Sequence, residues 1–220
     1  MKASLDTNII LHLYRANHQS LLFEMFDEEI YIDEFVYSIE LQNHGKDILP
    51  ILEQDIRSGK ITVIDKTSLK SLGIWNLYKE NLEEEKTFYP SSDMGEIHAI
   101  ALARTMGAVS VVTDDTKHRG PHYYLMRIEG YANMPLAFYE ILILLYLKGT
   151  YSVQQVIEIF NAVIEWNPEL PYNLRSIIEG FVRRFIATPY TQRDKNWFIK
   201  FCTTENISYK KKLKQLKDAL

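Results

Sequence analysis

The feature that most constrains this chain is the alternation of short strand-like and longer helix-like segments over its first 148 residues. The run Val109–Val112 is apolar apart from Ser110, which is typical of a strand that is covered on both faces, as in a parallel sheet. Successive parallel strands need a crossover, which is usually a helix and is right-handed. The sequence therefore predicts an α/β fold with a central parallel sheet.

The expected strands are Ala3–Leu5, Ile30–Ile32, Ile61–Ile64 and Val109–Val112. The expected helices are Ile9–Tyr14, Leu21–Phe26, Glu34–Asn43, Leu49–Arg57, one that Thr67 or Ser68 caps and that runs to about Leu82, and one from Ser92 or Asp93 to Met106. Between the last two helices, the segment EEEKTFYPSSD is predicted to be the main loop.

Strand patterns stop at Gly149, and the rest of the chain is helical or mixed in pattern. We therefore expect an α/β domain over residues 1–149 and a helical extension over residues 150–220. Residues 171–220 carry eleven Lys or Arg and four Asp or Glu, a balance of +7, whereas residues 1–170 carry −11. The basic extension suits a polyanion or the acidic body of the protein itself.

The composition is that of an ordinary globular protein, with 46% apolar and 25% charged residues. A single cysteine, Cys202, excludes an internal disulfide, and no Cys and His spacing resembles a zinc site. The apolar run 137–147 contains Glu140 and is much shorter than the roughly 20 residues that span a bilayer. We expect a cytoplasmic protein that has no secretory signal and no membrane contact.

Acidic residues stand where strands give way to loops or helices. Asp6 follows the first strand directly, and Asp114 follows the fourth after one residue, so both should reach the carboxyl edge of the sheet. Glu40 lies within a helix, while Asp93 and Glu96 share one face of the next helix's first turn. Clustered carboxylates repel each other and persist mainly by holding cations, and Mg²⁺ and Mn²⁺ prefer such oxygen ligands. Helix capping is the competing role of an Asp after a strand.

The ordered series LDTN, SIEL, SDMGEIHAIALA and VVTDD, followed by Arg119, resembles the PIN-domain nucleases. The most similar branch has the motifs D-x-G-E-x-x-A-I-x-L-A and T-D-D-x-x-x-R, and the run YANMPLAFYEILILLYLKG resembles its following helical segment. The resemblance covers roughly residues 1–150. It implies a three-layer α/β/α domain that cleaves phosphodiester bonds, usually in RNA, with one or two Mg²⁺ or Mn²⁺ ions.

By position, the resemblance assigns the catalytic, metal-binding acids to Asp6, Glu40, Glu96 and Asp114. It assigns supporting or substrate-binding roles to Asn8, Asp93, Thr113, Asp115 and Arg119. Asp114 and Asp115 are alternatives for the fourth acid, and for Asp93 we favour helix capping. His98 stands where many family members have an acid. We expect its side chain to be packed inside the protein or to contact the metal ligands without binding the metal itself.

The leading hypothesis is a Mg²⁺- or Mn²⁺-dependent nuclease that acts on RNA, with DNA as the alternative substrate. Its setting would be a toxin–antitoxin pair or phage defence, with an antitoxin or another protein as partner and a homodimer as one assembly. The rival is a degenerate PIN-like module that binds nucleic acid or protein without cleaving. A metal-dependent phosphatase is disfavoured, since Thr7 and Asn8 follow Asp6 in place of a D-x-D motif.

Overall fold

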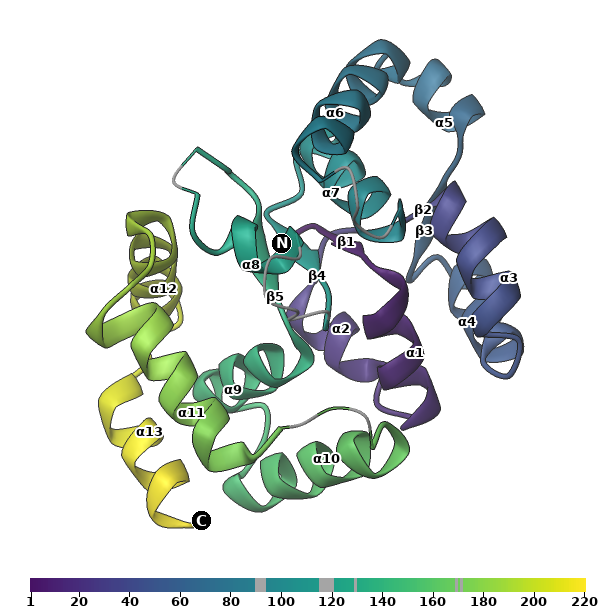
Figure 1. The fold of residues 1–220 in the computed structure, drawn as a ribbon. Coiled ribbons are helices and arrows are strands. Elements are labelled where there is room, and N and C mark those ends of the chain that lie inside the picture. Colours follow the sequence, from purple (N-terminus) through teal and green to yellow (C-terminus); the bar gives the residue numbers. More distant parts are fainter. Residues whose placement is uncertain (90–93, 115–120, 129, 169, 171) are drawn as a thin grey trace.

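The computed structural model describes residues 1–89, 94–114, 121–128, 130–168, 170 and 172–220 (Figure 1). One sheet contains five strands in the order β3-β2-β1-β4-β5, and every pairing is parallel. The strands are β1 Ala3–Leu5, β2 Ile30–Asp33, β3 Thr62–Ile64, β4 Ser110–Val112 and β5 Met134–Leu136. The predicted α/β fold with a central parallel sheet is therefore confirmed.

The helices that accompany the sheet are α1 Thr7–Arg15, α2 Ser20–Met25, η1 Val36–Glu40, α3 Leu41–His44, α4 Leu49–Arg57, α5 Lys66–Ser71, α6 Trp75–Phe88, α7 Met94–Met106, α8 Pro121–Leu125 and α9 Phe138–Lys148. The extension contains α10 Val153–Trp166, α11 Leu174–Val182, η2 Arg183–Ala187, α12 Gln192–Thr204 and α13 Tyr209–Asp218. The two segments η1 and η2 are π-helical.

Helices cover both faces of the sheet (Figure 1). Because successive strand residues point to opposite faces, Leu5 and Ile32 join the large core that also contains α1, α2 and α9. Tyr31 and Val111 face the other way and pack against residues of α7. Burial on both faces explains why β1, β2 and β4 consist mainly of apolar residues.

The order of the strands reverses at β1, whose neighbours are β2 on one side and β4 on the other. From β1 the chain builds outward to β3, and then crosses over to place β4 against the opposite edge of β1. In open parallel sheets, ligands bind beyond the carboxyl ends of the strands at such a reversal. The topology therefore selects the loops after β1 and β4 as the place to look for a site.

The strand β5 was not predicted, because its residues were included in the apolar segment that leads into α9. This strand is three residues long and contains Pro135, which lowers its strand propensity. It pairs only with β4 at the edge of the sheet, where the missing N–H of proline removes no bond to a further strand.

Two predicted helix boundaries in the segment that follows β3 were wrong. The N-cap of α5 is Asp65, whose carboxylate accepts the N–H of Ser68 at 2.7 Å, rather than Thr67 or Ser68. The helix then breaks at Gly73, which adopts a φ of 74°, and α6 begins afresh. Helix α6 continues to Phe88, so half of the expected loop is helical, as its run of good helix formers allows.

The extension shares its hydrophobic core with the sheet. Phe181 and Phe198 of the extension belong to the same buried cluster as Leu5 of β1. The guanidinium of Arg184 is buried as well, and donates to Glu140 of α9 and Asp194 of α12 at 2.7 Å each. The boundary at residue 149 stays a prediction, but the described core runs across it.

Candidate functional site

Asp6 and Glu96 meet at one hydroxyl group at the reversal of the sheet. The Thr113 hydroxyl lies 2.9 Å from Oδ2 of Asp6 and 3.3 Å from Oε1 of Glu96, and all three residues are buried. Backbone bonds hold both strand ends, since Asp6 N–H donates to Val112 and Thr113 N–H donates to Leu136. A hydroxyl has one proton, so it can donate to only one of the two carboxylates at a time.

Asp6 also has the capping role that competes with ligation. It is the N-cap of α1, and its Oδ2 accepts the backbone N–H of Asn8 at 3.4 Å. That distance is long for a hydrogen bond, whereas the contact with the Thr113 hydroxyl is of ordinary length. The structure thus places Asn8 beside the first acid, through its backbone.

Glu40 is brought to the same place by the π-helical segment η1, a feature that occurs frequently at functional sites. Its carboxylate accepts a hydrogen bond from the Thr7 hydroxyl. It also lies against the backbone of Gly95, where a Cβ atom would be 2.5 Å from Cδ of Glu40. Because Thr7 and Gly95 adjoin Asp6 and Glu96 in sequence, three predicted acids from separate elements converge.

Asp114 faces a different set of groups. Its Oδ1 accepts the N–H of Phe138 at the start of α9, and its Oδ2 lies 2.8 Å from Nδ1 of His12. The side chain is fully buried. Two residues of the extension secure this corner, as the Tyr172 hydroxyl donates to the backbone of Asp114 and Asn167 donates to that of His12. Asp114 therefore joins the sheet, α1, α9 and the extension.

The remaining predicted residues are placed as follows. Asp93, Asp115 and Arg119 lie outside the described residues. His98 is packed, as expected: its ring stacks on Phe35 at 4.4 Å, and its Nδ1 lies 3.0 Å from the carboxylate of Asp33.

Sequence reasoning missed several residues that build this region. Thr7 and Gly95 lie inside the motifs that carry Asp6 and Glu96, and their position there was the available signal. His12 and Asp33 gave none, because their roles depend on partners that are 102 and 65 residues away.

A hard divalent cation fits the donor groups of this site. Asp6, Glu40, Glu96 and Thr113 present only oxygen atoms, which suits Mg²⁺ and Mn²⁺ and not a thiolate- or imidazole-bound zinc. Over the described ranges, no three His, Cys, Asp or Glu side chains are grouped closely enough to hold a metal ion. Mg²⁺ in proteins usually keeps several waters and takes only one or two carboxylates.

Comparisons with known proteins add no identity to this geometry. The chain has no significant match among protein-family models, curated proteins or solved structures. Within the described part of the chain, every helix is too short or too polar to cross a membrane. The function is therefore argued from the site.

Proposed function

We propose that this protein is a metal-dependent, PIN-like nuclease that hydrolyses phosphodiester bonds, with RNA as the leading substrate and DNA as the alternative. The observation that carries the proposal is the meeting of Asp6 and Glu96 at the Thr113 hydroxyl, where the strand order reverses. Glu40, which packs against the residue before Glu96, adds a third carboxylate.

Asp6, Glu40 and Glu96 are the acids that would hold a hydrated Mg²⁺ or Mn²⁺. Because the three are not grouped closely enough to bind the ion all at once, some of them would contact it through its waters. A bound cation of this kind lowers the pKa of a coordinated water and offsets negative charge on phosphate oxygens. The Thr113 and Thr7 hydroxyls orient the carboxylates, so that little reorganisation is needed when the substrate arrives. No side-chain nucleophile is required for such a hydrolysis.

The position of Asp114 bears on the fourth acid. Both of its carboxylate oxygens are engaged, with α9 and with His12, so Asp114→Asn should reduce stability as well as any activity. This favours Asp115, the alternative that the sequence left open, as the fourth acid. Asp115→Asn should then reduce cleavage.

The basic extension is proposed to contact nucleic acid through part of α13 only. Lys210, Lys211 and Lys214 are exposed. Lys212, by contrast, donates to the backbone carbonyl of Leu147 at 2.9 Å and completes the C-terminus of α9. An antitoxin or other protein partner, a homodimer and a cytoplasmic location stay predictions.

The test is incubation of structured and unstructured RNA with Mg²⁺, Mn²⁺ or EDTA, with RNA binding measured in parallel. Asp6→Asn and Glu96→Gln should abolish cleavage and keep the melting temperature in EDTA, because removing one of two neighbouring charges relieves repulsion. The exposed Asp218→Asn, on α13, is the matched control.

Cleavage that EDTA and both site variants remove, and that the control retains, would support the nuclease. RNA binding by the wild-type protein without cleavage under any metal would instead favour the binding-module alternative. A large loss of melting temperature in both variants would show that these carboxylates are structural.

A further inference from the structure

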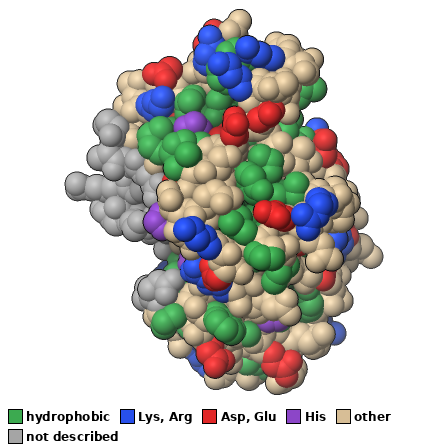
Figure 2. All heavy atoms as spheres, turned by 90° about the vertical axis from the view of Figure 1, so that its right-hand side faces the viewer, with side chains coloured by type: hydrophobic (Ala, Val, Ile, Leu, Met, Phe, Trp, Pro, Cys, Tyr) green, Lys and Arg blue, Asp and Glu red, His purple; other side chains and the backbone are tan. Residues whose placement is uncertain are grey.

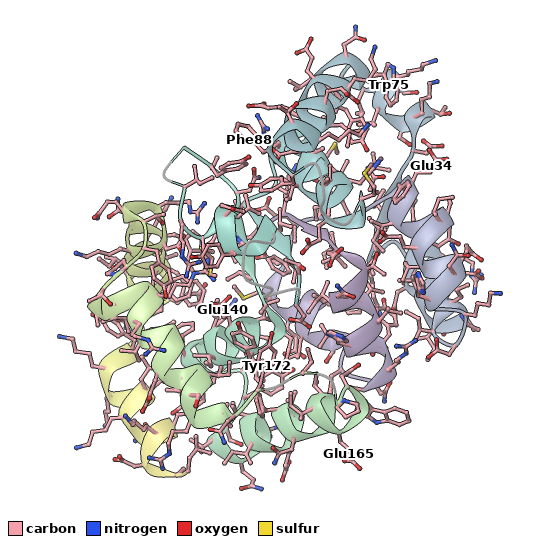
Figure 3. The ribbon with its side chains drawn as sticks, in the orientation of Figure 1. Glu34, Trp75, Phe88, Glu140, Glu165 and Tyr172 are labelled. Atoms are coloured by element: carbon pink, nitrogen blue, oxygen red, sulfur yellow. The ribbon has the colours of Figure 1, made fainter. Side chains whose placement is uncertain are left out.

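A cavity of about 380 Å³ opens between the end of β2, the start of α6 and α7. Its size lies within the range of small-ligand sites. The residues that shape it include Asp33, Phe35, Lys66, Trp75, Tyr78 and His98. Figure 3 shows Glu34 and Trp75, which both line this cavity, on the same side of the molecule.

Asp33 fixes the polar floor of this cavity. Its buried carboxylate accepts the N–H of Phe35 at 2.8 Å and the hydroxyl of Tyr78 at 2.6 Å, and lies 3.0 Å from Nδ1 of His98. Burial, together with the charge of Asp33, raises the pKa of Tyr78 above its ordinary range, so that residue remains a hydroxyl donor.

His98 contributes a second ring nitrogen to the cavity wall. Its Nδ1 lies 2.8 Å from the Tyr78 hydroxyl and 3.0 Å from the carboxylate of Asp33, whereas Nε2 forms no hydrogen bond among the described residues. Nε2 accepts or donates according to the tautomer of the ring. The cavity wall therefore contains a ring nitrogen that can hydrogen-bond to the polar edge of a ligand.

Aromatic rings and ammonium groups form the rest of the wall. Phe35 stacks on His98, and Trp75 stacks on Tyr78 with ring centroids 5.7 Å apart. The ammonium of Lys66 lies 5.2 Å from the Trp75 ring. Flat rings, a ring nitrogen that can hydrogen-bond and nearby ammonium groups are the features that bind a nucleobase and its phosphate.

The cavity adjoins the candidate metal site. Leu5 of β1 and Ile32 of β2 are paired in register, so Asp6 and Asp33 follow at the same level on neighbouring strands, which are about 4.8 Å apart. Helix α7 carries both Glu96 and His98. Figure 2 shows acidic, basic and apolar side chains interspersed on the face that bears α3, α4 and α5. Ligand binding on this face therefore depends on individual side chains rather than on an extended electrostatic potential of one sign.

We infer that this cavity binds a nucleobase, with the base between Phe35 and Trp75 and its polar edge hydrogen-bonded to Nε2 of His98. The inference rests on the proposed function in one respect, the position of the RNA strand. If a phosphate of the RNA lies at Asp6 and Glu96, a neighbouring base would lie in this cavity. Binding itself does not depend on cleavage.

The test measures the affinity of fluorescein-labelled, phosphorothioate-linked RNA pentanucleotides of each base in the presence of Mg²⁺. Trp75→Ala and His98→Phe should each weaken binding about fivefold or more, the lower limit for loss of one base contact. Trp166→Ala is the matched control, since that tryptophan is 62% exposed on α10. Lys66→Gln, at an exposed position, provides a variant whose folding is not at risk.

A strand with a single abasic position, moved along the pentanucleotide, should lose affinity at one position in the wild-type protein but not in Trp75→Ala. If nucleoside monophosphates displace the labelled pentanucleotide and unlabelled RNA does not, the cavity binds free nucleotides rather than an RNA strand. Wild-type affinity in Trp75→Ala and Lys66→Gln, or failure of the wild-type protein to bind any of these probes, would overturn the inference. Base binding by the wild-type protein, with no cleavage in the presence of Mg²⁺ or Mn²⁺, would support the base-binding cavity and argue against the nuclease function.

Discussion

Gly95→Ala is the substitution that most sharply separates the folding of this protein from its proposed chemistry. A Cβ atom at residue 95 would lie 2.5 Å from Cδ of Glu40, whereas ordinary contacts begin at 3.4 Å. One carboxylate oxygen of Glu40 would lie closer still, so the carboxylate must retreat by more than about 0.9 Å, which would disturb its hydrogen bond with the Thr7 hydroxyl. Because it is the far end of a flexible, half-buried side chain, it can do so without moving the backbone.

The expected effects on stability and on activity differ in size. Alanine in a helix is more favourable than glycine by about 0.5–1 kcal/mol, which offsets much of the lost hydrogen bond of Glu40. The melting temperature should thus stay within about 4 °C of wild type for a chain of this length. A displacement of about 1 Å in a catalytic group can cost about 100-fold in rate, and we expect a loss of that order in cleavage.

The assay combines thermal melting in EDTA, Mn²⁺ titration and RNA cleavage. Gly180→Ala in α11 is the control, since a Cβ atom there meets nothing within 4 Å. It should raise the melting temperature by about 1–4 °C and leave cleavage unchanged. Wild-type Mn²⁺ affinity and cleavage in Gly95→Ala would refute the reasoning, because Glu40 would then have no role at its present position.

Three further predictions test the extension. Arg184→Leu should lower the free energy of unfolding, measured in urea, by about 3–5 kcal/mol, because it removes the buried guanidinium that pairs with Glu140 and Asp194, of which Asp194 retains its pair with Arg193. The exposed pair of Lys217 with Glu179 should contribute less than about 1 kcal/mol. Equal losses from removing Arg184 and Lys217 would contradict this prediction. Burial raises the pKa of Cys202 from 9.0 to about 11, so its contribution to stability is complete below pH 9.0 and is lost as the pH rises through about 11. Its thiol should react with a disulfide reagent at about pH 8 far more slowly in the folded than in the unfolded protein, and similar rates would argue against this burial. Replacing three exposed lysines of α13, Lys210, Lys211 and Lys214, by glutamine should reduce the slope of RNA affinity against salt concentration by about 0.7 per lost contact. An unaltered affinity at low and physiological salt would show that these lysines are only solvated.

Local sequence patterns predicted the first four strands, since each is a short apolar run with a turn or helix signal on either side. They did not predict β5, because Pro135 is tolerated only through its edge position, which is a property of the whole sheet. The same holds for the acidic final turns of α6, which were predicted to be a loop. They are helical in the structure, where Glu85 pairs with Arg104 of α7. Interactions between distant segments decided both.

The sequence alone determined the parallel sheet and brought Asp6 to its carboxyl edge, because the alternation of strands and helices allows few topologies. The convergence of Glu40 with Asp6 and Glu96 is a tertiary result, since it depends on η1 and on the missing side chain of Gly95. Only the tertiary structure distinguished Asp114 from these acids. Its carboxylate is held by His12 and by the start of α9, groups that are far apart in sequence and meet only when the sheet is complete.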